Sequence, residues 1–205
     1  MKRLFLVGYM GCGKSTLGRK LARRLGAAFI DTDARVEEHE GATVADVFRY
    51  EGETRFREIE RDVLEEAIRD GGDAVISTGG GLPTWSDNME CMNRAGLTVY
   101  LRRTPEQIAR RLSPYGRQKR PRLRGLNDEE LVAFMTRDMA VREPFYAKAA
   151  LIIECGTMSD DEIAEFILDA LHEPSLPQCD DRSLRRGAGR PDALARETAC
   201  RARGA

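Results

Sequence analysis

The sequence lacks the patterns of a disulfide-stabilised or zinc-binding protein. It has five cysteines and two histidines in 205 residues, and the cysteines are scattered, with none in a CxxC pair or at metal-ligand spacing from a histidine. An odd number of isolated cysteines argues against a disulfide framework and against a zinc site. Reduced thiols fit best, so we predict a cytoplasmic location.

Long apolar runs and an excess of one charge are also missing. No segment approaches the roughly 20 apolar residues of a membrane span. Gly8 and Gly11 cut the apolar run near the N-terminus too early for a secretory signal. The formal net charge is −1, so no whole-chain field attracts nucleic acid or an anionic membrane. We therefore expect neither a nucleic-acid nor a membrane partner. A monomer with a small-molecule substrate is a separate expectation.

Short apolar runs alternate with longer amphipathic stretches, which is typical of βαβ units around a parallel sheet. Five runs are nearly continuous in apolar residues, as expected for strands covered by helices on both faces. The predicted strands are residues 4–7, 27–30, 74–77, 97–101 and 151–153. The predicted helices lie around residues 17–25, 59–68, 129–141 and 160–171, with the third of them stopped near Pro144.

The pattern changes at about Pro174. The residues that follow are rich in Arg, Gly, Asp and Ala and have few large apolar side chains. Such a segment cannot bury enough surface to offset the entropy lost on ordering. We predict one domain at residues 1–173 and a flexible, disordered tail at 174–205.

A phosphate-binding loop follows the first predicted strand. Residues 8–15 read GYMGCGKS, which matches GxxxxGK[ST] and opens the first predicted helix. Glycines let successive N–H groups converge on an anion, and the helix N-terminus adds partial positive charge. Lys14 can reach the β- and γ-phosphates, and the Ser15 hydroxyl can ligate Mg²⁺. The predicted ATP-binding residues here are Gly11, Cys12, Gly13, Lys14, Ser15 and Thr16.

Two aspartates follow the second predicted strand, at the edge where open α/β sheets bind ligands. Alternation along an extended Asp31-Thr32-Asp33 segment would point both carboxylates to one side. One could hold the metal through water, and the other could accept a proton from a hydroxyl. Because no aspartate ends the third strand, Mg²⁺ would depend on Ser15 and Asp31. The alternative is an ordinary DxD loop that caps the next helix.

Two further motifs suit an acidic substrate. In GETRFREIE, Arg57 and Glu60 are one helical turn apart, so the carboxylate can hold the guanidinium while its other N–H groups bind a second carboxylate. The alternative is a plain surface ion pair. Three glycines at residues 79–81 follow the third strand and would let a ligand lie against backbone N–H groups, or they form a simple flexible turn.

Together GYMGCGKST, DTD, GETRFREIE and GGG resemble the shikimate kinase family, a branch of the nucleoside-monophosphate-kinase-like P-loop fold. The similarity covers about residues 3–171. It implies the fold class α/β, as a three-layer α/β/α P-loop kinase with a five-stranded parallel sheet and a mobile lid. It also implies transfer of the γ-phosphoryl group of ATP, with Mg²⁺, to the 3-hydroxyl of shikimate, in aromatic amino acid (chorismate) biosynthesis.

The resemblance assigns roles to single residues. Asp33 contacts the ring hydroxyls and is the candidate base or orienting group. Arg57 and Arg142, the latter in a segment similar to the family's R-x-P-x-Y, bind the substrate carboxylate, and Glu60 orients Arg57. The implied substrate-binding residues are Asp33, Arg57, Glu60, Gly79, Gly80, Gly81 and Arg142, with Gly80 and Gly81 donating backbone hydrogen bonds.

A basic segment with interspersed Gly and Pro lies at about residues 112–125. An RNA-binding loop is one reading, but Tyr115 is its only aromatic residue available for stacking. A lid that closes on the ATP phosphates fits better. By the resemblance Arg120 contacts the phosphates and Arg111 lies near adenine.

The register within the lid stays open, with Arg117 and Lys119 as substitutes for Arg120. The predicted catalytic residues are Lys14 and Arg120, which neutralise the transferring group, and Asp33, which aligns the hydroxyl. Two other functions remain open at this point. One is another small-metabolite kinase, such as a gluconate kinase, and the other is a catalytically silent nucleotide-binding module.

Overall fold

Five parallel strands form the centre of the protein, in the order β2-β3-β1-β4-β5. A computed structural model describes residues 3–118 and 120–172; Lys119 and the predicted tail at 174–205 lie outside the described residues. The elements are β1 (Arg3–Val7), α1 (Lys14–Leu25), β2 (Ala28–Asp31), α2 (Thr32–Glu40), α3 (Val44–Arg69), β3 (Ala74–Ser77), η1 (Leu82–Thr84), α4 (Asn88–Ala95), β4 (Leu97–Arg102), α5 (Pro105–Arg111), α6 (Pro114–Gln118), η2 (Pro121–Leu123), α7 (Asp128–Tyr146), β5 (Leu151–Glu154) and α8 (Asp160–His172).

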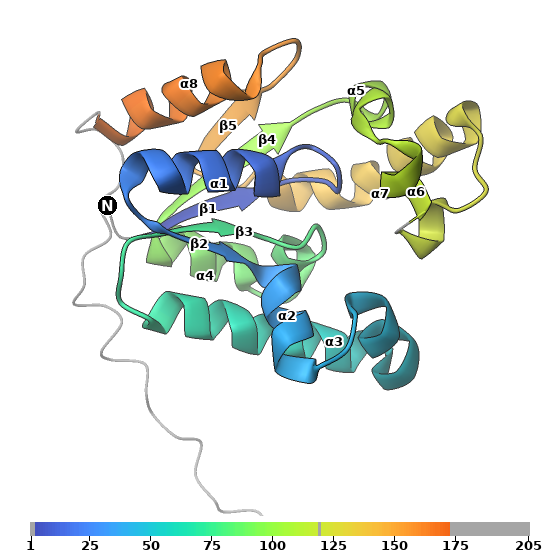
Figure 1. Cartoon of the computed structure of the whole chain (residues 1–205), viewed down its shortest axis with the longest axis horizontal. Helices are drawn as coiled ribbons and strands as arrows, with labels where there is room; N and C mark the ends of the chain where they lie inside the picture. The colour runs from blue at the N-terminus through green and yellow to red at the C-terminus, as the bar shows by residue number, and fades with distance from the viewer. Residues whose placement is uncertain (1–2, 119, 173–205) are drawn as a thin grey trace, which may run out of the picture.

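The strands explain why the sequence shows nearly unbroken apolar runs. β1 and β3 are buried along their whole length, whereas the edge strands β2 and β5 alternate more. α1 and α8 lie on one face of the sheet, and α3 and α4 lie on the other (Figure 1). The predicted three-layer α/β/α fold with a five-stranded parallel sheet is confirmed. No helix in the described ranges has the length and apolar character needed to span a bilayer.

The carboxyl ends of the central strands meet at one edge, because the strands are parallel. The register pairs Asp31 at the end of β2 with Ser77 at the end of β3, and Ser77 also lies beside Leu6 of β1. The phosphate loop leaves β1 at this edge. α2 with the start of α3 projects on one side of it, and α5 with α6 projects on the other (Figure 1).

A second, smaller hydrophobic cluster joins α2 to α3, separate from the main core around the sheet. It consists of Val36, Val47, Phe56, Ile59 and Val63. α3 itself contains a break, since Gly52 has φ 82° and ψ 171°. Glycine adopts this positive φ without the steric cost that other residues meet.

Two local predictions differ from the structure. Pro144 lies inside α7, which continues to Tyr146. Proline removes one backbone hydrogen bond from a helix, but the buried Tyr146 anchors the last turn through its hydroxyl, which donates to Gly80 O. The expected extended segment at residues 31–33 is also wrong, because Asp31 caps α2 and Asp33 lies in the first helical turn.

Candidate active site

The phosphate loop connects β1 to α1 and has the backbone that its glycines predict. Gly8, Gly11 and Gly13 have φ values of 141°, 81° and 111°. Gly13 is the N-cap of α1, and no side chain caps this helix, whereas α2, α3, α5 and α7 all carry a side-chain cap. The first N–H groups of α1 are therefore available to an anion.

Lys14 places its charge inside this loop. Its side chain is 8% exposed, and its Nζ donates to Gly8 O at 2.7 Å and to Tyr9 O at 3.0 Å. Cys12 Sγ lies 3.8 Å from the same nitrogen. The neighbouring Thr16 is exposed in the first turn of α1. The loop thus combines free N–H groups and an ammonium group on one concave backbone segment.

Oxygen ligands gather beside the loop. Ser15 Oγ donates to Asp31 Oδ2 at 2.7 Å and lies 3.2 Å from Ser77 Oγ. Hydroxyl and carboxylate oxygens are the donors that Mg²⁺ accepts, together with water and phosphate oxygens. No cluster of three or more His, Cys, Asp or Glu able to hold a metal occurs in the described ranges. These residues fit a magnesium ion shared with a nucleotide.

Asp33 and Glu60 bring two carboxylates to the turn after β3, and Glu60 is buried whereas Asp33 keeps an exposed surface. A Cβ at Gly79 would lie 2.8 Å from Glu60 Oε1 and would clash with Asp33 Oδ1. Desolvation by the surrounding protein groups raises the pKa of Asp33, and the Asp31 carboxylate raises it further. Burial also raises the pKa of Glu60, to about 7, although the Arg57 guanidinium opposes this. Both groups hold a proton more readily than an exposed carboxylate does.

Arg57, in α3, lies against this turn and pairs with two acids. Its Nη1 donates to Glu60 Oε2, its Nη2 lies 3.5 Å from Glu53 Oε1, and its side chain is 12% exposed. A Cβ at Gly81 would lie 2.5 Å from Arg57 Nη2. The guanidinium therefore occupies the space that a side chain at Gly81 would take.

Arg142 reaches the turn from α7. Its Nη2 lies 3.1 Å from Asp138 Oδ2, its guanidinium is 5.6 Å from the Tyr9 ring centroid, and its Nη1 lies 3.7 Å from where a Cβ of Gly80 would be. Asp138 also accepts a hydrogen bond from Tyr9 Oη at 2.7 Å. Asp138 thus orients Arg142 as Glu60 orients Arg57.

The three glycines are consequently the place where the site assembles. Each faces a different charged group: Asp33 and Glu60 at Gly79, Arg142 at Gly80, and Arg57 at Gly81. The Gly79 N–H donates to Thr32 Oγ1 at 2.8 Å, so it is not free for a ligand. Gly80 and Gly81 have N–H groups with no acceptor among the described residues.

Two of the lid arginines, Arg117 and Arg120, have different surroundings. Arg120 Nη1 donates to Gly116 O, and burial lowers the pKa of Arg120 while the Asp33 carboxylate opposes this shift. Arg117 instead bonds Asp128 Oδ1 at 2.6 Å and Ala109 O at 3.3 Å. Among the described lid arginines, this geometry favours Arg120 over Arg117 as the one facing the site.

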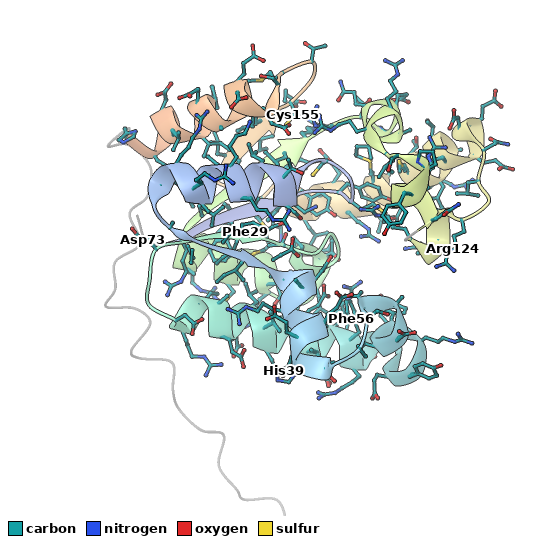
Figure 2. The ribbon with its side chains drawn as sticks, viewed as in Figure 1. Phe29, His39, Phe56, Asp73, Arg124 and Cys155 are labelled. Carbon is teal, nitrogen blue, oxygen red and sulfur yellow. The ribbon has the colours of Figure 1, made fainter. Side chains whose placement is uncertain are left out.

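Arg111 lies over the phosphate loop. A Cβ at Gly13 would be 3.4 Å from its Nη2, and the same nitrogen donates to Asp160 Oδ1 at 3.2 Å. Side chains around Arg124 on the lid side and around Phe56 on the α3 side both lie beyond the carboxyl ends of the strands (Figure 2). The predicted nucleotide-side and substrate-side residues are thus brought to one edge of the sheet.

Sequence reasoning missed two residues of this site. Ser77 was not predicted because only an aspartate was expected as a metal ligand at the end of β3, although the Ser77 hydroxyl lies beside Ser15 Oγ. Asp138 was also missed, although its i, i+4 spacing from Arg142 repeats the logic that selected Arg57 and Glu60. The helix predicted over 129–141 stopped one residue before Arg142, which hid the pair.

Known proteins of one family match this chain over most of its length. A profile of the family described as shikimate kinase matches residues 10–172. The shikimate kinase of Parabacteroides distasonis is 44% identical over 171 residues, covering 83% of this chain and 98% of the relative. A shikimate kinase of Bacteroides thetaiotaomicron is 44% identical over 173 residues, covering 84% and 98%.

Solved structures lead to the same family. A crystal structure of shikimate kinase from Bacteroides thetaiotaomicron superposes with a TM-score of 0.76 at 41% identity, covering 84% of this chain and 99% of that one. The Acinetobacter baumannii shikimate kinase, solved in complex with shikimate, gives 0.75 at 34% identity, covering 86% and 96%. The chain therefore belongs to the shikimate kinase family, whose members are ATP- and Mg²⁺-dependent kinases of the α/β P-loop fold.

Proposed function

We propose that the turn at residues 79–81 lines a shikimate site in which Arg57 and Arg142 bind the carboxylate and Asp33 receives the 3-hydroxyl. One observation carries the proposal: Asp33, Arg57 and Arg142 all lie against three consecutive glycines, beside the phosphate loop that holds Lys14. The Acinetobacter baumannii relative, solved with shikimate, supports this substrate.

The reaction joins the 3-hydroxyl oxygen to the γ-phosphorus as the bond to the ADP oxygen breaks. The hydroxyl proton passes to Asp33, whose pKa is raised by desolvation and by the Asp31 carboxylate, so the carboxyl can hold it. Lys14 and Arg120 stabilise the charge on the transferring group. When bound by Ser15 and Asp31, Mg²⁺ supplies charge neutralisation at the phosphates.

Substrate binding depends on the two oriented arginines. A guanidinium whose fork is already held by a carboxylate loses little further freedom when it binds a second one. Glu60 holds Arg57 and Asp138 holds Arg142. The N–H groups of Gly80 and Gly81 supply further donors to the substrate. The lid at 112–125 closes over the phosphates and brings Arg120 to them.

A coupled ADP-release assay tests the proposal. Shikimate should support ATP-dependent turnover and gluconate should not. Asp33→Asn and Lys14→Met should each lower kcat by orders of magnitude, and Arg57→Ala should mainly raise the KM for shikimate. An Arg57→Ala variant with wild-type KM for shikimate would contradict the carboxylate assignment. Turnover with gluconate alone, or ATP binding without transfer to either acid, would contradict the substrate.

We also propose the domain extent, location and oligomeric state of the active enzyme. Residues 1–173 would form the catalytic domain and act as a cytoplasmic monomer, without a nucleic-acid or membrane partner. Light scattering at assay concentrations tests the oligomeric state. A dimer whose dissociation removes activity would contradict the monomer.

A further inference from the structure

A buried arginine with no role in the site described above lies directly behind the phosphate loop. Arg103 follows β4 and is 5% exposed. Its Nε donates to Cys12 O at 3.1 Å, and its Nη1 donates to Gly156 O at 3.1 Å. The side chain therefore joins the phosphate loop to the loop between β5 and α8.

The bond to Cys12 O fixes the direction of a peptide group in the cradle. A trans peptide is planar, so the carbonyl of Cys12 and the N–H of Gly13 point in opposite directions. Arg103 holds the carbonyl toward the protein interior, and the Gly13 N–H consequently points outward. That N–H has no acceptor among the described residues. Gly13, with φ 111°, is the N-cap residue of α1, and no side chain caps this helix.

The charge of Arg103 is unbalanced at this place. Both of its acceptors are neutral carbonyls, and it forms no ion pair with a carboxylate in the described part of the chain. A buried charge is costly unless an opposite charge compensates it. Phosphate groups bound on the outer side of the loop would supply that charge, and in a low dielectric the attraction acts across the backbone.

The second bond reaches a tight turn on the other side of the nucleotide region. Gly156 has φ 40°, and the turn is closed by a bond from Met158 N to Cys155 O at 2.8 Å. Cys155 lies where β5 meets α8 (Figure 2), and its N–H donates to Arg102 O at 3.0 Å. One guanidinium thus positions two loops that are more than 140 residues apart in sequence.

We propose that Arg103 is a positioning residue for the nucleotide. It presents the Gly13 N–H to the phosphates, adds a buried positive charge behind them, and holds the β5–α8 loop in register with the phosphate loop. It does not contact shikimate. The inference rests on the proposed function only in that a nucleotide binds at the phosphate loop.

The test measures MgADP and shikimate affinities separately by isothermal titration calorimetry. Arg103→Lys keeps the charge but cannot reach both carbonyls, and Arg103→Met removes charge and bonds together. We expect the Kd for MgADP to rise about tenfold in the lysine variant and about a hundredfold in the methionine variant, as for lost hydrogen bonds to a charged group. The Kd for shikimate should stay within about twofold. Arg102→Gln, a neighbouring exposed arginine, serves as the matched control and should leave MgADP affinity unchanged.

Folding of each variant is checked by circular dichroism, and the lysine variant decides if the methionine variant does not fold. An unchanged Kd for MgADP in folded Arg103→Lys would overturn the proposal. An equal loss of MgADP and shikimate affinity would overturn it as well, because it would indicate general damage. Failure of the unmodified protein to bind MgADP would instead contradict the proposed function, so the two failures are distinguishable.

Discussion

The Arg57 guanidinium fills the space next to Gly81 where a β-carbon would otherwise stand. Gly81 has φ −91° and ψ −23°, a conformation that alanine adopts without strain. Backbone conformation therefore does not require glycine here, and the close approach of Arg57 does.

Gly81→Ala should displace Arg57 and leave the fold intact, because the clash falls on the end of a flexible side chain. We expect the KM for shikimate to rise about tenfold, as for a weakened charge-assisted bond, with the KM for ATP unchanged. Steady-state kinetics with each substrate varied in turn measures this. Gly72→Ala is the matched control, since nothing lies within 4 Å of its β-carbon position. Equal effects of the two substitutions would reject the explanation.

Asp138→Asn tests the second arginine. The amide would bind Arg142 and Tyr9 less strongly than the carboxylate does, so Arg142 would lose its fixed orientation. The KM for shikimate should rise by roughly tenfold with a smaller change in kcat. Glu129→Gln changes an exposed acid on the same helix and should have no such effect. A wild-type KM in the Asp138 variant would show that Arg142 needs no orienting partner.

The pKa of Glu60, raised to about 7 by burial, predicts a pH-dependent substrate affinity. As the pH falls below about 7, Glu60 becomes protonated and binds the Arg57 guanidinium less strongly, so the KM for shikimate should rise. Glu60→Gln should have a raised KM that no longer changes over this range. Kinetics from pH 5.5 to 8.5 distinguish the two profiles, and parallel profiles would count against Glu60 as the titrating group.

Glu60 also affects the free energy of unfolding, and here low pH is favourable, whereas for substrate binding it is unfavourable. A carboxyl group whose pKa is raised on folding binds its proton more tightly in the folded state. Its contribution is therefore largest below pH 4.5, the unfolded value, and is lost as the pH rises through about 7. The free energy of unfolding should fall by up to about 3 kcal/mol over this interval. Urea unfolding of the wild type and of Glu60→Gln, which should show a flatter dependence, measures it.

Arg120 and Arg117 should separate catalysis from stability within the lid. Arg120→Met should lower kcat about 10²- to 10³-fold, in the range seen when one transition-state donor is removed. Arg117→Met should instead lower the melting temperature, because it breaks bonds to Asp128 and Ala109. Thermal unfolding and kcat measured on both variants test this division. A large kcat loss confined to the Arg117 variant would reverse the assignment of the two arginines.

The sequence predicted the strands well because buried parallel strands are nearly uniform in character. All five were placed within one residue of their observed ends at each terminus. The order of the strands could not be predicted in the same way, since no local pattern encodes which strands are neighbours. The short helices α2 and α4 were missed, because α2 buries only Thr32 and Val36 and so shows no clear apolar face.

Among the site residues, those within recognisable motifs were predicted, Arg142 included, whereas Ser77 and Asp138 were not. Arg57 and Glu60 were found because their partnership is local. The approach of Arg142 to Gly80 depends on how α7 packs beside the turn after β3, and helical spacing alone cannot show this. Nothing in the local sequence Arg102-Arg103-Thr104 distinguishes Arg103 from its neighbour. Its role depends on the contact with the phosphate loop at Cys12 O, which only the fold shows.

The small cluster around Val36 and Phe56 joins α2, which carries Asp33, to the first part of α3, which carries Arg57. Because it is separate from the main core, a cavity made there by Val36→Ala would loosen α2 against α3 and shift Asp33 away from Arg57. The β1–α1 region rests on other side chains and would keep its shape. A cavity in this cluster would therefore leave a protein that still binds the nucleotide but no longer positions the substrate hydroxyl that receives the phosphoryl group.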